Sequence, residues 1–214
     1  MNFAMLLGLV ISVNQSVELD PRLSKVPEDL LSLPRVVYVN DFDDESARRF
    51  EEDMEEAKRT GQPVIPVVID SYGGSVYSLL SMVDTIKNIG VPVATVAKGK
   101  AMSAGALLLS CGTEGMRYAT PNSTILIHDV SSMASGKVGD IVVEAAEAER
   151  LNKLLFTMLA KNVGKPDNYF TDLIFGKGRV DIYLTPDDAL KHNIINKIGD
   201  PQLKTKVTLT TTLE

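Results

Sequence analysis

The stretch 63-PVIPVVIDSYGGS-75 combines a long apolar run with a glycine turn, and it decides how the rest of the chain is interpreted. Pro63 to Asp70 is apolar almost throughout, which is typical of a strand buried on both faces of a parallel sheet. Two adjacent glycines then allow a tight turn. From Ser75 to Ile89 the apolar residues recur at helical spacing, and Gly90 is a helix stop. We therefore predict a strand, a tight turn and a helix, which together are the repeating unit of an α/β fold.

The same alternation continues on both sides of this unit. Further strands are expected at Arg35–Asn40, Val93–Lys98, Thr124–Asp129 and Val180–Tyr183. Further helices are expected at Asp43–Thr60, Ala104–Ser110, Asp140–Asn162 and Pro166–Phe175, and from Thr185 onward, with Thr185 as N-cap and Pro186 at the first helical position. Strands separated by helices indicate an α/β fold with a mainly parallel sheet. The helix from about 140 to 162 has too many apolar residues for one buried stripe, which predicts a projecting helix used in assembly.

Composition limits the possible classes of protein. The 214 residues are 44% hydrophobic and 23% charged, as expected for one globular domain. We assign this domain to 35–200, with a divergent N-terminal segment at 1–34 and a polar C-terminal tail at 201–214. The net charge of −6 and the lack of a basic run argue against nucleic-acid binding. A single cysteine excludes an internal disulfide and a thiolate zinc cluster, and it suits a reducing compartment such as the cytoplasm.

The N-terminus carries an apolar run from Phe3 to Val13. It is too short to span a bilayer. It has the length of a signal-peptide core, but no Lys or Arg precedes it and the first basic residue is Arg22. We expect a buried or partner-docked segment here, with a cleaved signal as the lesser alternative.

Two turns between a strand and a helix could carry chemistry. In the turn from Asp70 to Ser75, glycine N–H groups could face an anion, although the pattern taken alone favours a purely structural turn. No Gly-Lys-Ser/Thr follows, so a nucleotide-binding P-loop is not expected. In the turn from Ala101 to Gly105, small residues flank Ser103. Such a serine is either an exposed nucleophile beside an oxyanion-binding N–H group or a plain N-cap.

A serine nucleophile needs a base and a carboxylate that orients the base. The chain has two histidines: His128 ends an apolar strand, and His192 lies near the end of a helix, where a structural role is expected. Two chain orders remain open from the residues alone, Ser103–His128–Asp181 and Ser103–Asp181–His192.

Two further nucleophile arrangements are weaker. A Ser–Lys peptidase of the signal-peptide-peptidase type would use Lys98 or Lys100 as base. Cys111 follows the Ser103 helix and is interpreted as a small core residue rather than a thiol nucleophile.

Four segments between Val64 and Ile198, taken together, resemble the ClpP family of caseinolytic serine peptidases, which have the ClpP/crotonase fold. They are Asp70-Ser71-Tyr72-Gly73-Gly74-Ser75-Val76, Gly99-Lys100-Ala101-Met102-Ser103-Ala104-Gly105-Ala106, Ile127-His128 and Asp181-Ile182-Tyr183-Leu184-Thr185-Pro186. The resemblance implies repeated ββα units with the long helix as a projecting handle. It also implies a serine endopeptidase that degrades or processes unfolded proteins.

The resemblance also implies roles for individual residues. These are Ser103 as nucleophile, His128 as base, Asp181 as orienting carboxylate, the N–H groups of Gly74 and Ala104 as oxyanion hole, and Gly73 and Gly74 as peptide-binding backbone. His192 would then be structural. The resemblance implies no metal or cofactor, polypeptide substrates, a homo-oligomer of stacked heptameric rings, a possible AAA+ unfoldase partner and a cytoplasmic location.

The sequence departs from the family pattern at several positions. Asp70 and Tyr72 stand where the family usually has the Asn and Pro of Asn-Ser-Pro-Gly-Gly, and Asp129-Val130 stands where it has Gln-Pro. Ser131–Gly136 replaces the glycine-rich strand, and residues 1–34 lack the usual axial-loop sequence. These departures indicate a divergent member, and the N-terminus would also suit a phage-encoded or head-maturation relative. The alternatives are a catalytically silent ring subunit and a crotonase-like acyl-CoA enzyme that shares only the oxyanion hole.

Overall fold

The computed structural model describes residues 34–133, 135–178, 180–201 and 203, and the strand backbones at 9–12 and 206–209. It divides the chain into two compact units, Arg35–Asp200 and a second unit made of Met1–Pro34 with Pro201–Glu214. In the second unit, β1 (Leu9–Ser12) pairs antiparallel with β9 (Lys206–Leu209). The rest of the predicted apolar N-terminal run, and the rest of the polar tail apart from Pro201 and Leu203, lie outside the described residues.

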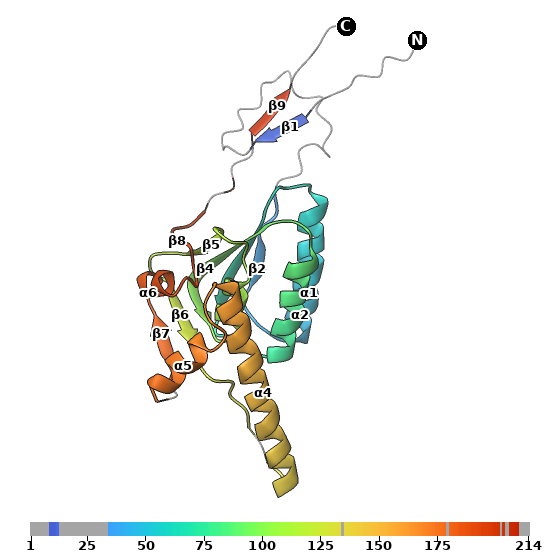
Figure 1. The fold of residues 1–214 in the computed structure, drawn as a ribbon. Coiled ribbons are helices and arrows are strands. Elements are labelled where there is room, and N and C mark those ends of the chain that lie inside the picture. Colours follow the sequence, from blue (N-terminus) through green and yellow to red (C-terminus); the bar gives the residue numbers. More distant parts are fainter. Residues whose placement is uncertain are drawn as a thin grey trace. The chain divides into compact units, whose positions relative to one another are not determined.

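The larger unit contains helices and strands in alternation (Figure 1). The helices are α1 (Asp44–Arg59), α2 (Val76–Asn88), α3 (Ala104–Ser110), α4 (Val138–Asn162), α5 (Tyr169–Gly176) and α6 (Pro186–Lys191). The strands are β2 (Val37–Val39), β3 (Ile65–Ser71), β4 (Val93–Met102), β5 (Arg117–Ala119), β6 (Thr124–Ile127), β7 (Ile182–Leu184) and β8 (Lys197–Ile198).

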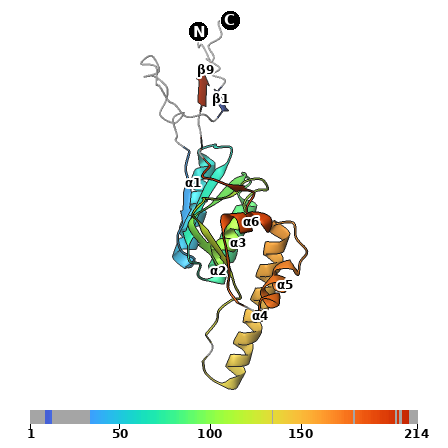
Figure 2. The same ribbon diagram turned by 90° about the vertical axis from the view of Figure 1, so that its left-hand side faces the viewer.

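The sheet of this unit is mainly parallel. Its strands follow the order β2-β3-β4-β5-β8, all paired in parallel, while β6 pairs in parallel with β4 and antiparallel with β7. The helices α1 and α2 pack against each other beside the sheet, and α3 contacts β3, β4 and α4. The helix α4 extends beyond the sheet, as both views show (Figures 1 and 2). The predicted α/β class with a mainly parallel sheet and a projecting long helix is confirmed.

The strand β4 is longer than the sequence indicated. The predicted strand ends at Lys98, but β4 continues to Met102, immediately before Ser103. The pairing with β3 is irregular at this point, because Ile69 pairs with Ala97 whereas Ser71 pairs with Ala101. Gly99 lies in the irregularity with φ of 88°. Gly99 therefore marks a β-bulge within β4 rather than the end of the strand.

The capping signal at Thr185 predicted the start of α6 well, whereas the very short strands β5 and β8 were missed. Asp43 caps α1, and the Thr185 hydroxyl accepts the Asp188 N–H at the start of α6, with Pro186 next to it as predicted. The strands β5 and β8 have three and two residues, which is too short for a recognisable periodic pattern. They are defined by pairing with β4 and with each other.

The long helix α4 has two parts with different environments. Its second part packs on the core through buried side chains: Leu151, Leu155, Phe156, Leu159 and Ala160. Its first part has exposed apolar side chains, including Val142 (62% exposed) and Val143 (68% exposed). The excess of apolar residues noted in the sequence is therefore divided along the helix, with one part buried within the chain and the other open to solvent.

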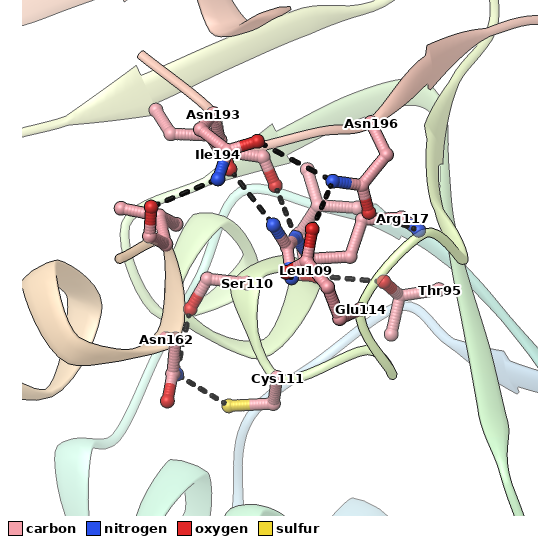
Figure 3. Close-up of polar contacts among 11 residues, drawn as sticks. Thr95, Leu109, Ser110, Cys111, Glu114, Arg117, Asn162, Asn193, Ile194 and Asn196 are labelled. Atoms are coloured by element: carbon pink, nitrogen blue, oxygen red, sulfur yellow. Dashed lines mark hydrogen bonds and ion pairs between the residues drawn. The ribbon is translucent and has the colours of Figure 1, made fainter. Parts of the chain in front are cut away.

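A buried arginine connects the last part of the domain to β5 (Figure 3). Arg117 is 1% exposed, and its Nε and Nη2 donate to the carbonyl oxygens of Ile194 and Asn193 at 3.2 and 3.1 Å. Its Nη1 pairs with Glu114, whose other carboxylate oxygen accepts from Asn196. Since the donors and acceptors are matched inside the domain, this network fixes the segment between α6 and β8 on the sheet.

We expect Arg117→Ala to destabilise the domain strongly. The substitution leaves two buried carbonyl groups without their donors, at about 1–3 kcal/mol each, so a loss of about 3 kcal/mol is expected. Urea unfolding at a fixed protein concentration measures the effect. Arg48→Ala on the exposed surface of α1 is the control and should change stability by less than about 0.5 kcal/mol. Equal stability of the two variants would contradict a structural role for the network.

Candidate active site

Ser103 occupies a strained turn between β4 and α3. Its backbone has φ of 55° and ψ of −119°, a conformation that is rare for a residue with a side chain and is typical of functional turns. The Ser103 N–H donates to the Leu126 carbonyl on β6 at 2.9 Å, and its carbonyl accepts from Ala106 and Leu107 in α3. The hydroxyl makes no capping bond to α3. The alternative of a plain N-cap serine is thus not supported, and the Oγ atom is available for chemistry.

The Gly73-Gly74 segment lies against this turn. A Cβ atom placed on Gly73 would lie 2.7 Å from the Cβ of Ser103, and one on Gly74 would lie 2.5 Å from the Phe42 carbonyl oxygen. Both glycines have positive φ, at 103° and 155°. The Ser71 hydroxyl accepts the Gly73 N–H at 3.0 Å. Only glycine fits at these two positions, so the backbone here passes directly beside the serine.

A small pocket of about 50 Å³ brings several predicted residues together at the carboxyl ends of β3, β4 and β6. Its walls include Gly74, Ser103, Ala104 and His128, together with Asn152 from α4. Sites at this edge of a parallel sheet are common because the strands deliver their following loops to one place. A larger cavity of about 920 Å³ between α4 and α5 is adjacent, since both share Val130, Asn152 and Phe156 as lining residues.

Asp181 lies near His128 by strand register but outside this pocket. In the antiparallel pair β6–β7, Ile127 is opposite Ile182, so His128 and Asp181 occupy the next position along the two chains. The Asp181 side chain is exposed, and no hydrogen bond joins the side chains of Ser103, His128 and Asp181, all of which are described. The structure therefore brings Ser103 and His128 to one pocket and leaves Asp181 at its edge.

His192 belongs to a different part of the domain. Its Nδ1 is 2.8 Å from the Tyr169 hydroxyl, and its ring contacts Tyr169 and Phe170. Burial lowers the pKa of the His192 imidazole, with nearby Lys165 acting in the same direction. His192 does not line the Ser103 pocket, which disfavours the chain order Ser103–Asp181–His192.

The alternative bases, Lys98 and Lys100, and the alternative nucleophile, Cys111, are in environments that do not suit these roles. Lys100 pairs with Asp70 at 2.6 Å, and this hydrogen bond raises the pKa of the Lys100 ammonium group, contrary to what a general base requires. Lys98 pairs with Asp200 at 3.0 Å. Burial raises the pKa of the Cys111 thiol to about 11, so it stays protonated and unreactive near neutral pH.

Three residues of the site were not identified from the sequence. Phe42 supports Gly74 from behind and accepts the Ser75 N–H at 2.7 Å, Ser71 holds Gly73, and Asn152 lines the pocket. Asn152 does carry a signal, because it is a polar residue within the apolar, buried part of α4. Phe42 and Ser71 resemble ordinary strand and loop residues, and only the fold reveals their contacts.

A mainly parallel sheet with a strained serine turn at its carboxyl edge is the arrangement used by α/β hydrolases that employ a serine nucleophile. A sequence model described as Clp protease matches residues 19–202. The chain is 40% identical over 139 residues to "ATP-dependent Clp protease proteolytic subunit 3" of Nocardia farcinica, covering 64% of this chain and 61% of that protein. It is 37% identical over 145 residues to subunit 1 of Chlamydia felis, covering 68% and 70%, and 34% identical over 140 residues to the subunit of Porphyromonas gingivalis, covering 65% and 61%.

The chain belongs to the Clp protease family. This family consists of serine-type peptidases that act in protein degradation, and the enzyme class of the chain is thereby a hydrolase of peptide bonds. The matched region spans 61 to 70% of the length of the three relatives. Among the described residues, no helix is both long and apolar enough to cross a membrane.

We expect Gly73→Ala to abolish access to Ser103. The new Cβ atom would collide with the Ser103 side chain and with the Met102 carbonyl oxygen, 2.9 Å away. A displacement of about 1 Å at a nucleophile costs about 100-fold in rate, so labelling by a fluorophosphonate should fall by at least that factor. Gly61→Ala is a matched control, because Gly61 also has positive φ but no atom lies within 4 Å of a Cβ placed there. It should destabilise the chain slightly and leave labelling unchanged; equal labelling of both variants would refute close packing of Gly73 on Ser103.

Proposed function

We propose that this chain hydrolyses peptide bonds in unfolded polypeptides with Ser103 as nucleophile, His128 as general base and Asp181 as the carboxylate that orients the base. One observation carries the proposal: Ser103 stands on a strained turn with an uncommitted hydroxyl in the same pocket as His128. This conformation costs free energy for a residue other than glycine, and it persists where the surrounding fold enforces it, most often at functional sites.

The proposed reaction proceeds in two stages. The Ser103 Oγ attacks the peptide carbonyl carbon while His128 takes its proton, and the N–H groups of Gly74 and Ala104 bind the oxyanion. His128 then donates the proton to the leaving amine, and the C–N bond breaks to give an acyl-enzyme. Water, deprotonated by His128, attacks the ester and releases the second peptide with Ser103 restored.

Substrate binding in this proposal relies on the main chain. An extended peptide would run beside Gly73 and Gly74 and pair with their backbone, as in other strand-addition complexes. Among the described residues, neither glycine N–H group donates a hydrogen bond to backbone, although Gly73 bonds the Ser71 hydroxyl, so Gly74 offers the donor for the peptide. Main-chain recognition gives little selection between side chains, which suits the degradation of many different proteins.

The proposal predicts different effects for the two histidines. Ser103→Ala should abolish fluorophosphonate labelling, and His128→Ala should reduce peptidase activity by about 1,000-fold or more, as loss of a triad member does. His192→Gln should leave the rate nearly unchanged, because the His192 ring contacts Tyr169 and Phe170, which do not line the Ser103 pocket. Peptide hydrolysis and mass spectrometry of the labelled chain measure both effects.

The outcomes separate the competing functions. Labelling at a serine other than Ser103 would show that Ser103 is not the nucleophile. A large rate loss in His192→Gln with normal activity in His128→Ala would establish the other chain order. An acyl-CoA enzyme or a silent ring subunit would show no labelling of the wild-type chain.

Assembly into stacked rings, with an AAA+ unfoldase as partner, is a further part of the proposal. The relatives are named proteolytic subunits of ATP-dependent proteases. In this chain, the first part of α4 exposes Ile141, Val142 and Val143, a surface that contact with other subunits would cover. Because Asp181 is exposed and not bonded to His128, such contacts would also help to order the catalytic groups. A cytoplasmic location belongs to the same proposal and is supported by the single cysteine.

We expect Val142→Glu combined with Val143→Glu to lower the assembly state and the activity together. Charged side chains at these positions oppose burial between subunits but leave the core intact, since both side chains are exposed within the chain. Leu155→Glu would be unsuitable for this test because Leu155 is 7% exposed and belongs to the core. Glu144→Gln is the control on the same part of α4. Light scattering coupled to size exclusion measures the mass, and a fully active wild-type monomer would contradict the ring proposal.

A further inference from the structure

A hydrogen bond connects the chain just after His128 to the middle of α4. The Val130 N–H donates to the Asn152 Oδ1 at 2.6 Å, over a separation of 22 residues. Both residues line the small pocket that contains Ser103 and His128. The bond therefore lies inside the candidate active site, two residues from the proposed base.

Asn152 occupies the point where α4 enters the core. The residues on the N-terminal side of it, from Val138 to Arg150, are exposed or half-buried, whereas Leu151, Leu155 and Phe156 are buried. Packing of these buried neighbours holds the backbone of α4 at Asn152. The acceptor of the Val130 N–H is thus carried by the packed part of the helix.

A second contact fixes the same region of α4. The Tyr77 hydroxyl on α2 donates to Glu147 Oε1 at 2.8 Å, and Arg150 pairs with the same carboxylate. Hydrogen bonds from Arg150 and Tyr77 lower the pKa of Glu147 to about 2, so this carboxylate stays charged and keeps accepting near neutral pH. The helix that carries Asn152 is consequently tied to α2, whose first turn follows the Gly73-Gly74 segment.

Position 130 carries a backbone donor in this chain. The resemblance described above places a proline here, which has no N–H group and restricts φ by its ring. Val130 has an N–H group and no such restriction. The hydrogen bond to Asn152 satisfies that donor, and it also restricts the backbone at Val130, as a proline ring would.

We propose that Asn152 is a positioning residue for the catalytic base: its amide oxygen holds the Val130 N–H and thereby fixes the direction in which the chain leaves β6 at His128. The inference rests on the proposed function, because it gives a role to Asn152 only if His128 acts on Ser103. Without the bond, the chain after Ile127 gains freedom and the imidazole spends less time in reach of the serine hydroxyl. Asn152 itself takes no proton and forms no bond to substrate.

The test compares variants of Asn152 in the full-length protein. Asn152→Ala removes the acceptor and should lower kcat for a peptide substrate and the rate of fluorophosphonate labelling by about 10- to 100-fold, with KM nearly unchanged. Asn152→Asp keeps an acceptor oxygen in the same place and should retain kcat within about threefold at its optimum pH. Its added negative charge should move the acidic limb of the pH–rate profile to higher pH, since it favours the protonated imidazole.

Asn162→Ala is a matched control on the same helix. Asn162 is also half-buried and donates to Ser110 Oγ at 2.9 Å, but it does not line the pocket. Its loss should lower the unfolding temperature without changing kcat. If Asn152→Ala fails to fold or to assemble, Asn152→Leu removes the acceptor while keeping the side-chain volume, and it should lower kcat by a similar factor.

The results distinguish this inference from the function on which it rests. If the wild-type protein does not label at Ser103, the proposed function is wrong. If the wild-type protein labels and assembled Asn152→Ala labels at the same rate, the proposed function stands and the positioning role is wrong. Rescue by Asn152→Asp with a shifted pH–rate profile, together with an unchanged kcat in Asn162→Ala, would support the role.

Discussion

The backbone of Ser103 is the constraint on which the rest of the site depends. A residue with a side chain at positive φ costs about 1–3 kcal/mol, so the surrounding structure must hold it in place. The hydrogen bond to Leu126 on β6 and the glycine backbone beside the Ser103 side chain do so from two sides. The first requires β4 to continue to Met102 so that it pairs with β6, and the second requires two glycines after β3. The bulge at Gly99, the length of β4 and the Gly73-Gly74 turn are therefore parts of one arrangement.

The helix α4 connects this arrangement to the outside of the domain. Its second part contributes Leu155 and Phe156 to the pocket wall, while its first part presents apolar side chains to solvent. A rigid helix transmits a shift at one end to the other, because its backbone hydrogen bonds leave little freedom within it. Contacts with other subunits at the exposed end would therefore bear on the position of the pocket wall. In the proposed assembly, this helix would link activity to contacts between subunits without a separate regulatory site.

The sequence predicted those features that depend on neighbouring residues and missed those that depend on distant ones. The buried strand before Asp70, the helix after Ser75 and the turn at Ser103 follow from local apolar patterns, glycines and caps. The continuation of β4 past Gly99 and the strands β5 and β8 exist because of pairing between segments far apart in the chain. For the same reason the sequence did not reveal Phe42 and Asn152, because their partners, Gly74 and Val130, lie 32 and 22 residues away in the chain. Asp181 was assigned only through the family resemblance, and the strand register brings it near His128 without a bond.

Val130 stands where the family resemblance implies a proline, and its hydrogen bond to Asn152 shows how this chain holds the backbone there. A proline stiffens the backbone and removes a donor in one step. A valine does neither, and a half-buried N–H group without an acceptor would cost about 1–3 kcal/mol in lost hydrogen bonding. Asn152 removes that cost through a single contact that also crosses from the loop to α4. A proline ring would restrict the backbone locally. Here a hydrogen bond between the loop after β6 and α4 does so instead, and the backbone geometry after His128 therefore depends on the position of α4.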